Sequence, residues 1–110
     1  MNKVQIKTKI FSSANVLQVS AGTNCPQGGD VGHGGRTYFK LENQAGTGLV
    51  VKVNGKEFDL SRDGNLEIIL AGDTECETFL DGLKFAVQTL ESQLNNQKEK
   101  VVTQEIDIAD

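Results

Sequence analysis

The residues best suited to ligand chemistry lie in one loop, Thr23–Arg36. The stretch from Gly22 to Arg36 holds six of the 12 glycines and the only proline of this 110-residue chain. Because glycines lack a Cβ atom, several backbone N–H groups can point into one concavity that binds phosphate or carboxylate. Arg36, at the exit of the loop, could add a bidentate contact to the same anion. We therefore expect the functional centre at this loop.

The predicted ligand-binding site continues into the strand after the loop. There, Tyr38 or Phe39 could stack on a base or ring of the ligand. The spacing matches no known phosphate fingerprint, because no Gly-Lys-Ser/Thr follows and the loop precedes a strand. The alternative is that the glycines only serve tight turns. The predicted ligand-binding residues are Gly28, Gly29, Asp30, Gly32, His33, Gly34, Gly35, Arg36, Thr37 and Tyr38.

Catalysis and metal binding have weaker support in the sequence. His33 is the only histidine and could act as a proton shuttle or metal ligand, which leaves a small hydrolase as an alternative. No nucleophile elbow, HExxH motif or paired carboxylates accompany it. A zinc site could be formed by Cys25, Asp30, His33 and Cys76, but these residues lack the usual CxxC or HxxxH spacing. The sequence therefore predicts no enzyme, no metal and no cofactor.

An α+β domain must position the loop. Apolar and polar residues alternate as in short antiparallel strands, about five to six in number, packed against one C-terminal amphipathic helix. The first strand carries a lysine row that suits an exposed edge. Asn54-Gly55 predicts a type I′ hairpin turn. The expected strands lie around residues 4–10, 17–21, 37–41, 49–53, 58–60 and 66–70.

The helix is predicted to start at a capping box, Thr74 with Glu77, and to run to Leu94 along one apolar stripe. Acidic residues at its start, Asp73 and Glu75, would repel a phosphate, so an anionic ligand is expected at the glycine loop instead. Residues 1–94 then form one domain. Residues 95–110 form either a polar tail or an exchanged arm, because residues 102–108 have strand periodicity.

Charge and composition limit the partners. A net charge of −4 argues against binding duplex nucleic acid, although a compact anion can still be held locally. No apolar run approaches the roughly 18 residues of a membrane span, and no leader pattern is seen. The expectation is a cytoplasmic protein with reduced thiols, and a Cys25–Cys76 disulfide is the less favoured alternative.

The string Gly28–Thr37, with Gly72-Asp73-Thr74-Glu75 opening a helix, resembles small proteins encoded by tailed bacteriophages over roughly residues 1–92. Several phage proteins of this size sequester cyclic-nucleotide signals of bacterial immunity, as in the anti-CBASS and anti-Thoeris class. The resemblance implies a viral anti-defence sponge in the host cytoplasm, and it transfers no binding residue.

The first hypothesis is therefore a non-enzymatic homo-oligomer that encloses a small anionic, nucleotide-like ligand. The alternative is a protein-interaction module, such as a host-factor inhibitor or a virion or assembly component, whose loop contacts a protein surface.

Overall fold

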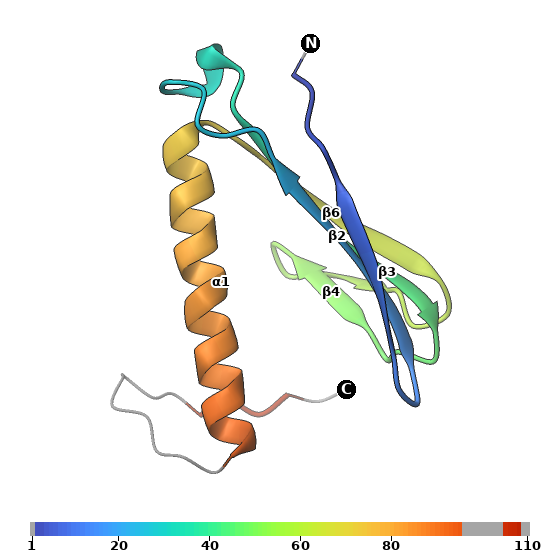
Figure 1. Cartoon of the computed structure of the whole chain (residues 1–110). Helices are drawn as coiled ribbons and strands as arrows, with labels where there is room; N and C mark the ends of the chain where they lie inside the picture. Colours follow the sequence, from blue (N-terminus) through green and yellow to red (C-terminus); the bar gives the residue numbers. More distant parts are fainter. Residues whose placement is uncertain (1, 96–104, 109–110) are drawn as a thin grey trace. The chain divides into compact units, whose positions relative to one another are not determined.

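In a computed structural model, the described part of the chain forms six antiparallel strands in two sheets followed by one long helix (Figure 1). The structure describes residues 2–95 and 105–108. The predicted α+β class is confirmed. The contacts within the chain divide it into two compact units. The unit Met1–Glu77 contains the described strands, and the unit Thr78–Asp110 contains most of the helix. The predicted exchanged arm lies mostly outside the described residues, and residues 105–108 form neither helix nor strand.

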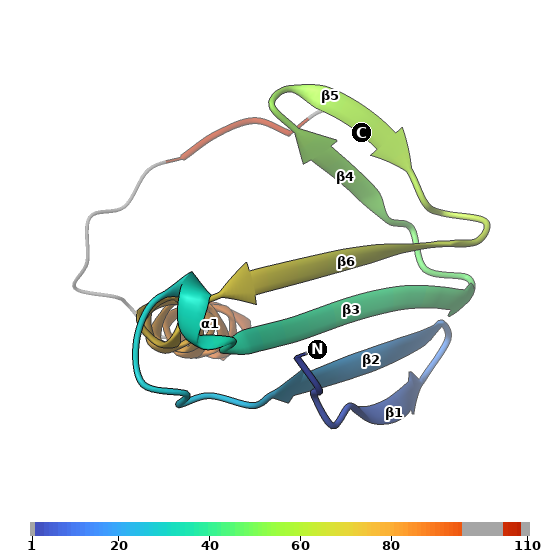
Figure 2. The same cartoon turned by 90° about the horizontal axis from the view of Figure 1, so that it is seen from above.

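The larger sheet has the strand order β1-β2-β3-β6 (Figure 2). Its first strand is at an edge, as predicted, but it begins at Lys7 and not near residue 4. The central strand β3 pairs with β2 and with β6, which places Tyr38 opposite Ile69. Side chains far apart in the sequence thus meet on this sheet. The strands are β1 (Lys7–Ser12), β2 (Val16–Thr23), β3 (Arg36–Ala45) and β6 (Gly64–Ala71).

The register gives the two faces of this sheet different chemistry. One face carries the rows Leu17–Val19–Ala21, Phe39–Leu41 and Leu66–Ile68–Leu70. The other face carries Arg36, Tyr38, Lys40 and Glu42 of β3. Directly opposed residues of antiparallel strands share a face. The polar face therefore carries Arg36 and Tyr38, whereas Thr37 lies on the face of the apolar rows, opposite Leu70.

The lysines of β1 lie on the apolar face, which the sequence did not predict. Lys9 pairs with Val19 and Lys7 with Ala21, while Thr8 on the other face pairs with Ser20. Lys9 lies over the ring of Phe11, with Nζ 5.2 Å from its centroid. Lysine stems can cover apolar surface while the ammonium groups stay in water, so an edge strand tolerates this arrangement.

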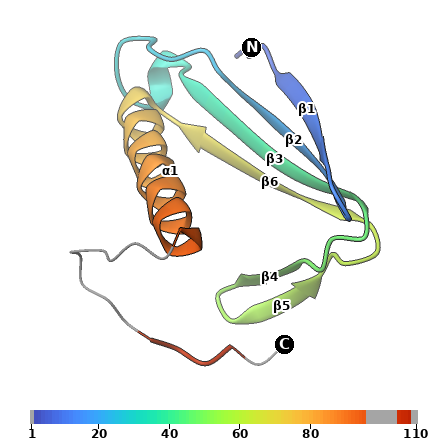
Figure 3. The same cartoon turned by 60° about the horizontal axis from the view of Figure 1, so that its bottom comes forward.

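The smaller sheet is a hairpin of β4 (Val50–Val53) and β5 (Lys56–Asp59), and it follows on from the ends of β3 and β6 (Figure 3). Its two turn residues, Asn54 and Gly55, have φ of 52° and 80°, the positive values that a type I′ turn requires. The Asn54-Gly55 prediction is confirmed.

A buried asparagine ties the base of this hairpin to β3. Asn43 is 3% exposed, and its Nδ2 donates to the carbonyl oxygens of Thr47 at 2.8 Å and Leu60 at 2.7 Å. One side chain therefore joins the end of β3 to both connections of the hairpin.

The helix α1 spans Asp73–Leu94. It begins one residue before the predicted cap, so Thr74 lies inside the first turn. Gly72 precedes it with a φ of 117°, which a side chain would strain. No helix in residues 2–95 and 105–108 combines the length and the apolarity that crossing a membrane requires.

Candidate functional site

The glycine-rich loop contains a turn of 3-10 helix, η1 (Val31–His33), where the sequence predicted no regular element. The Asp30 side chain caps it by accepting the N–H of Gly32 at 3.0 Å and contacting His33 Nδ1 at 3.1 Å. Gly34, with a φ of 86°, ends the turn. The hydrogen bond with His33 and the Gly32 amide lower the pKa of Asp30. Asp30 and His33 are thus engaged with each other at the exposed tip.

Asn24 closes the loop at its base. Its Oδ1 accepts the N–H of Arg36 at 2.7 Å, and its Nδ2 donates to the carbonyl of Gly34 at 3.1 Å. The backbone N–H of Asn24 also donates to the backbone carbonyl of Arg36 at 3.2 Å. These bonds fix the point at which Arg36 leaves the loop and β3 begins.

The amides at the start of the loop hold an anion that belongs to the chain itself. The Asp73 carboxylate accepts the N–H groups of Gln27, Gly28 and Gly29 at 2.9, 2.8 and 2.9 Å. We call this arrangement the Asp73 clasp. Glycine amides form the anion-binding concavity expected of such a loop, but a residue of the helix start fills it. The amides of Gly28 and Gly29 are therefore engaged before any ligand arrives.

The Asp73 clasp predicts a response to acid. The Gln27 amide, followed by those of Gly28 and Gly29, lowers the pKa of Asp73 below its ordinary value of 3.8, against an opposing effect of burial. A carboxyl with a lowered folded pKa stabilises the fold fully above its unfolded pKa and loses that contribution as the pH falls through the folded pKa. The clasp is therefore intact at neutral pH and opens only in acid.

An acid titration followed by amide NMR checks this prediction. The resonances of Gln27, Gly28 and Gly29 are expected to shift together with a midpoint below 3.8. Asp73→Asn should remove the transition, and Gly32 serves as the control because it reports on Asp30. Independent midpoints for the three amides would contradict a shared carboxylate.

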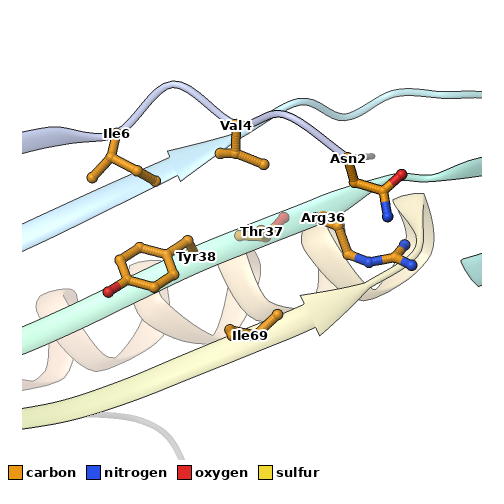
Figure 4. A pocket seen from close by; sticks show the side chains of 7 residues that line it. All are labelled: Asn2, Val4, Ile6, Arg36, Thr37, Tyr38 and Ile69. Atoms are coloured by element: carbon orange, nitrogen blue, oxygen red, sulfur yellow. The ribbon is translucent and has the colours of Figure 1, made fainter.

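A hollow of about 420 Å³ lies beside the loop exit, within the unit that contains the sheet (Figure 4). Its volume is within the usual range for small-molecule sites, about 300–1,000 Å³. Asn2 and Arg36 lie at one end and Tyr38 at the other. We call it the Arg36 hollow, and it is lined by Asn2, Val4, Ile6, Arg36, Thr37, Tyr38 and Ile69.

Arg36 is the cation of this hollow. Its Nη1 donates to the carbonyl oxygens of Val31 at 3.1 Å and Gly35 at 2.8 Å, which orients the guanidinium. No ion pair joins Arg36 to a carboxylate in the described part of the chain. Since a guanidinium carries five N–H donors, most of them are left for another acceptor.

An aromatic ring and two exposed apolar side chains form the rest of the Arg36 hollow. The Tyr38 hydroxyl donates to Glu67, and this hydrogen bond raises the pKa of the phenol. Glu67 thereby holds the ring in place. Ile69 is 68% exposed and Ile6 is 43% exposed. Large apolar side chains left open beside a fixed ring make a surface on which a flat ligand can lie.

The wall opposite β3 is the segment Asn2–Ile6, whose approach depends on a glycine in β2. A Cβ atom at Gly22 would collide with the carbonyl oxygen of Gln5 and touch Ile6 Cδ1. Only glycine lets the two backbones come this close. The residue at position 22 therefore helps shape the Arg36 hollow without lining it.

The structure brings together only part of the predicted site. Arg36, Thr37 and Tyr38 line the hollow, and the Thr37 hydroxyl is bonded to Thr23 at 2.9 Å, so Thr37 acts as wall. The hollow-lining residues that the sequence did not single out are Asn2, Val4, Ile6 and Ile69. The other predicted residues lie in the loop, namely Gly28, Gly29, Asp30, Gly32, His33, Gly34 and Gly35.

The positions of the two cysteines bear on the zinc site that the sequence left as an alternative. Cys25 and Cys76 are both free thiols in the structure. Cys25 Sγ lies 3.9 Å from Thr37 Oγ1, and Cys76 Sγ lies 3.6 Å from Thr23 Oγ1. Within residues 2–95 and 105–108, no three His, Cys, Asp or Glu side chains are arranged to hold a metal ion.

Comparison of the chain with protein-family models, with curated proteins and with solved structures finds no match. The residues of the Arg36 hollow and of the loop are therefore the basis for inferring the function.

Proposed function

We propose that this protein is a non-enzymatic binding protein that takes up a small nucleotide-like anion in the Arg36 hollow. The observation that carries the proposal is an arginine without a carboxylate partner in the described chain, oriented at one end of a hollow whose lining also includes the Tyr38 ring and three aliphatic side chains. An unpaired guanidinium in such a place binds phosphate or carboxylate through parallel N–H···O bonds.

The arrangement fits a ligand with two parts. The anionic group would meet Arg36 and the side-chain amide of Asn2, which lie at the same end of the hollow (Figure 4). A flat ring would lie toward Tyr38, Ile6 and Ile69. A nucleotide has both parts in one small molecule, and stacking of a base on an aromatic side chain contributes about 1–3 kcal/mol.

The charges around the hollow favour a small anion over a polyanion. Lys40, the next cation along β3, is paired with Glu42 at 3.2 Å. Glu67, which holds Tyr38, adds negative charge near the ring. One free guanidinium beside two carboxylates matches a ligand of low charge, and the chain's net charge of −4 disfavours a long phosphate backbone.

The proposed role is sequestration. Tight binding with slow release is sufficient for it, and no proton transfer or nucleophile is required. The resemblance of Gly28–Thr37 to small proteins of tailed bacteriophages is compatible with this role, because several phage proteins of this size capture immune signals. Such a protein would act in the cytoplasm of the infected cell.

A thermal-shift screen tests the function. The purified protein is screened with nucleoside monophosphates, cyclic mononucleotides, cyclic dinucleotides, the matching nucleosides and inorganic phosphate. A ligand that binds only the folded chain adds RT ln(1 + [L]/Kd) to its stability, about 2.7 kcal/mol at 100 times Kd. We expect a nucleotide to raise the melting temperature more than its nucleoside or phosphate alone. A melting temperature unchanged by every compound would contradict the proposal.

A further inference from the structure

Glu67 of β6 stands at the end of the Arg36 hollow that is farther from Arg36. It is two residues from Ile69 on the same strand, so both side chains belong to the face that carries the hollow. The Tyr38 hydroxyl donates to Glu67 Oε2, and Figure 4 shows this hydroxyl pointing away from Arg36. The carboxylate of Glu67 therefore lies just beyond the ring of Tyr38.

The Glu67 carboxylate keeps most of its capacity to accept hydrogen bonds. An ionised carboxylate has about four lone-pair sites, and Tyr38 uses one of them. Lys40 is directly opposite Glu67 in the register, but its ammonium group is paired with Glu42 at 3.2 Å. Within residues 2–95 and 105–108, no ion pair joins Glu67 to a cation. Because Glu67 is also exposed, a ligand in the hollow can reach its free lone pairs.

The separation of Arg36 and Glu67 suits the two ends of one nucleotide. Arg36 is four residues before Lys40, the residue opposite Glu67, which corresponds to about 13 Å along the strand. A single nucleotide spans such a distance between its phosphate and the outer edge of its base, once a hydrogen bond of about 3 Å is added at each end.

The base edge that meets Glu67 must supply hydrogen-bond donors, because an ionised carboxylate only accepts. Guanine presents two neighbouring donors on this edge, N1–H and the N2 amino group, which match the two oxygens of a carboxylate. Adenine and cytosine present an amino group beside a ring nitrogen that carries a lone pair, and a carboxylate repels that lone pair. Uracil presents one N–H between two carbonyl oxygens. A carboxylate in this place therefore favours guanine.

We propose that Glu67 selects the base, so that the ligand of the Arg36 hollow is a guanine mononucleotide. This inference rests on the function proposed above, in which Arg36 holds the phosphate and Tyr38 stacks on the base. Glu67 adds the reading of the base edge.

Isothermal titration of the full chain tests the inference with guanosine, inosine and adenosine monophosphates, each in its linear and its cyclic form. Inosine keeps the N1–H of guanine but lacks the N2 amino group. One hydrogen bond to a charged group changes affinity about 10-fold or more. We therefore expect the guanosine compound to bind about 10-fold more tightly than the inosine compound, and the adenosine compound to bind more weakly than both.

Glu67→Gln removes the charge and replaces one acceptor oxygen with a donor. The preference for guanosine over inosine should fall from about 10-fold to about twofold or less. Glu57→Gln is the matched control, because Glu57 is exposed on β5, lies outside the Arg36 hollow and changes the net charge by the same amount. It should leave the preference unchanged. Circular dichroism establishes that both variants fold.

Equal affinities for the guanosine and adenosine compounds, both weakened by Arg36→Ala, would overturn this inference and leave the proposed function standing. A guanosine preference that survives Glu67→Gln, or that Glu57→Gln reduces as much, would also overturn it. If none of the compounds binds the wild-type chain, both the inference and the proposed function are wrong.

Discussion

Replacing Arg36 with alanine is expected to weaken nucleotide binding about 100-fold, because each hydrogen bond from a charged donor contributes about 1.5–3 kcal/mol and the ligand loses at least one of them. The free protein should change little. The guanidinium bonds that are lost go to the carbonyls of Val31 and Gly35 at the surface, and their removal should lower the free energy of unfolding by about 1 kcal/mol or less. Isothermal titration and urea unfolding measure the two effects separately.

Arg62→Ala is the matched control for this prediction. Arg62 is the only other arginine of the chain, it is exposed, and it lies outside the Arg36 hollow. Its loss changes the net charge by the same amount as the loss of Arg36. If both variants weaken binding equally, the effect is one of overall charge, and Arg36 has no special place in the site.

The largest effect on stability is expected from Asn43→Asp. The substitution removes both donors that hold the Thr47 and Leu60 carbonyls and places a carboxylate oxygen next to them in a buried position. Asn43 Oδ1 already has no hydrogen-bond partner among the described residues, so the new charge gains no compensating donor. We expect a loss of about 3 kcal/mol in the free energy of unfolding, and a smaller loss of about 2 kcal/mol for Asn43→Ala.

Asn65→Asp makes the same chemical change at an exposed position of β6 and should alter stability by less than about 0.5 kcal/mol. Chemical unfolding of the three variants gives the comparison. An Asn43→Asp protein as stable as Asn65→Asp would show that the base of the β4–β5 hairpin does not depend on this side chain.

Local patterns were sufficient to predict the elements of the fold. Asn54-Gly55 specified its turn, because a type I′ turn depends on two adjacent residues alone. The helix was placed to within one residue at its start, since its apolar stripe repeats over five turns. The lysine row of β1 indicated an edge strand correctly, but it could not indicate the face, which depends on the pairing with β2.

The candidate site was predicted less completely, because its geometry depends on contacts between distant segments. The loop was recognised from its glycines. The carboxylate that accepts hydrogen bonds from the loop amides belongs to Asp73, which lies 44 residues after Gly29. Tyr38 was recognised as an aromatic side chain after the loop. Its neighbour Ile69 could be found only from the pairing of β3 with β6. Strand order has no local signal in the sequence, so Ile69 and the wall formed by Asn2–Ile6 were missed.

The most direct test is an NMR titration of the ¹⁵N-labelled protein with a pool of nucleoside monophosphates, cyclic mononucleotides and cyclic dinucleotides. We expect amide shifts to gather at Ile6, Arg36, Tyr38 and Ile69, while Asn54 in the β4–β5 turn does not respond. An unchanged spectrum, or shifts confined to the Gly28–Gly35 amides, would show that the Arg36 hollow is not the binding site.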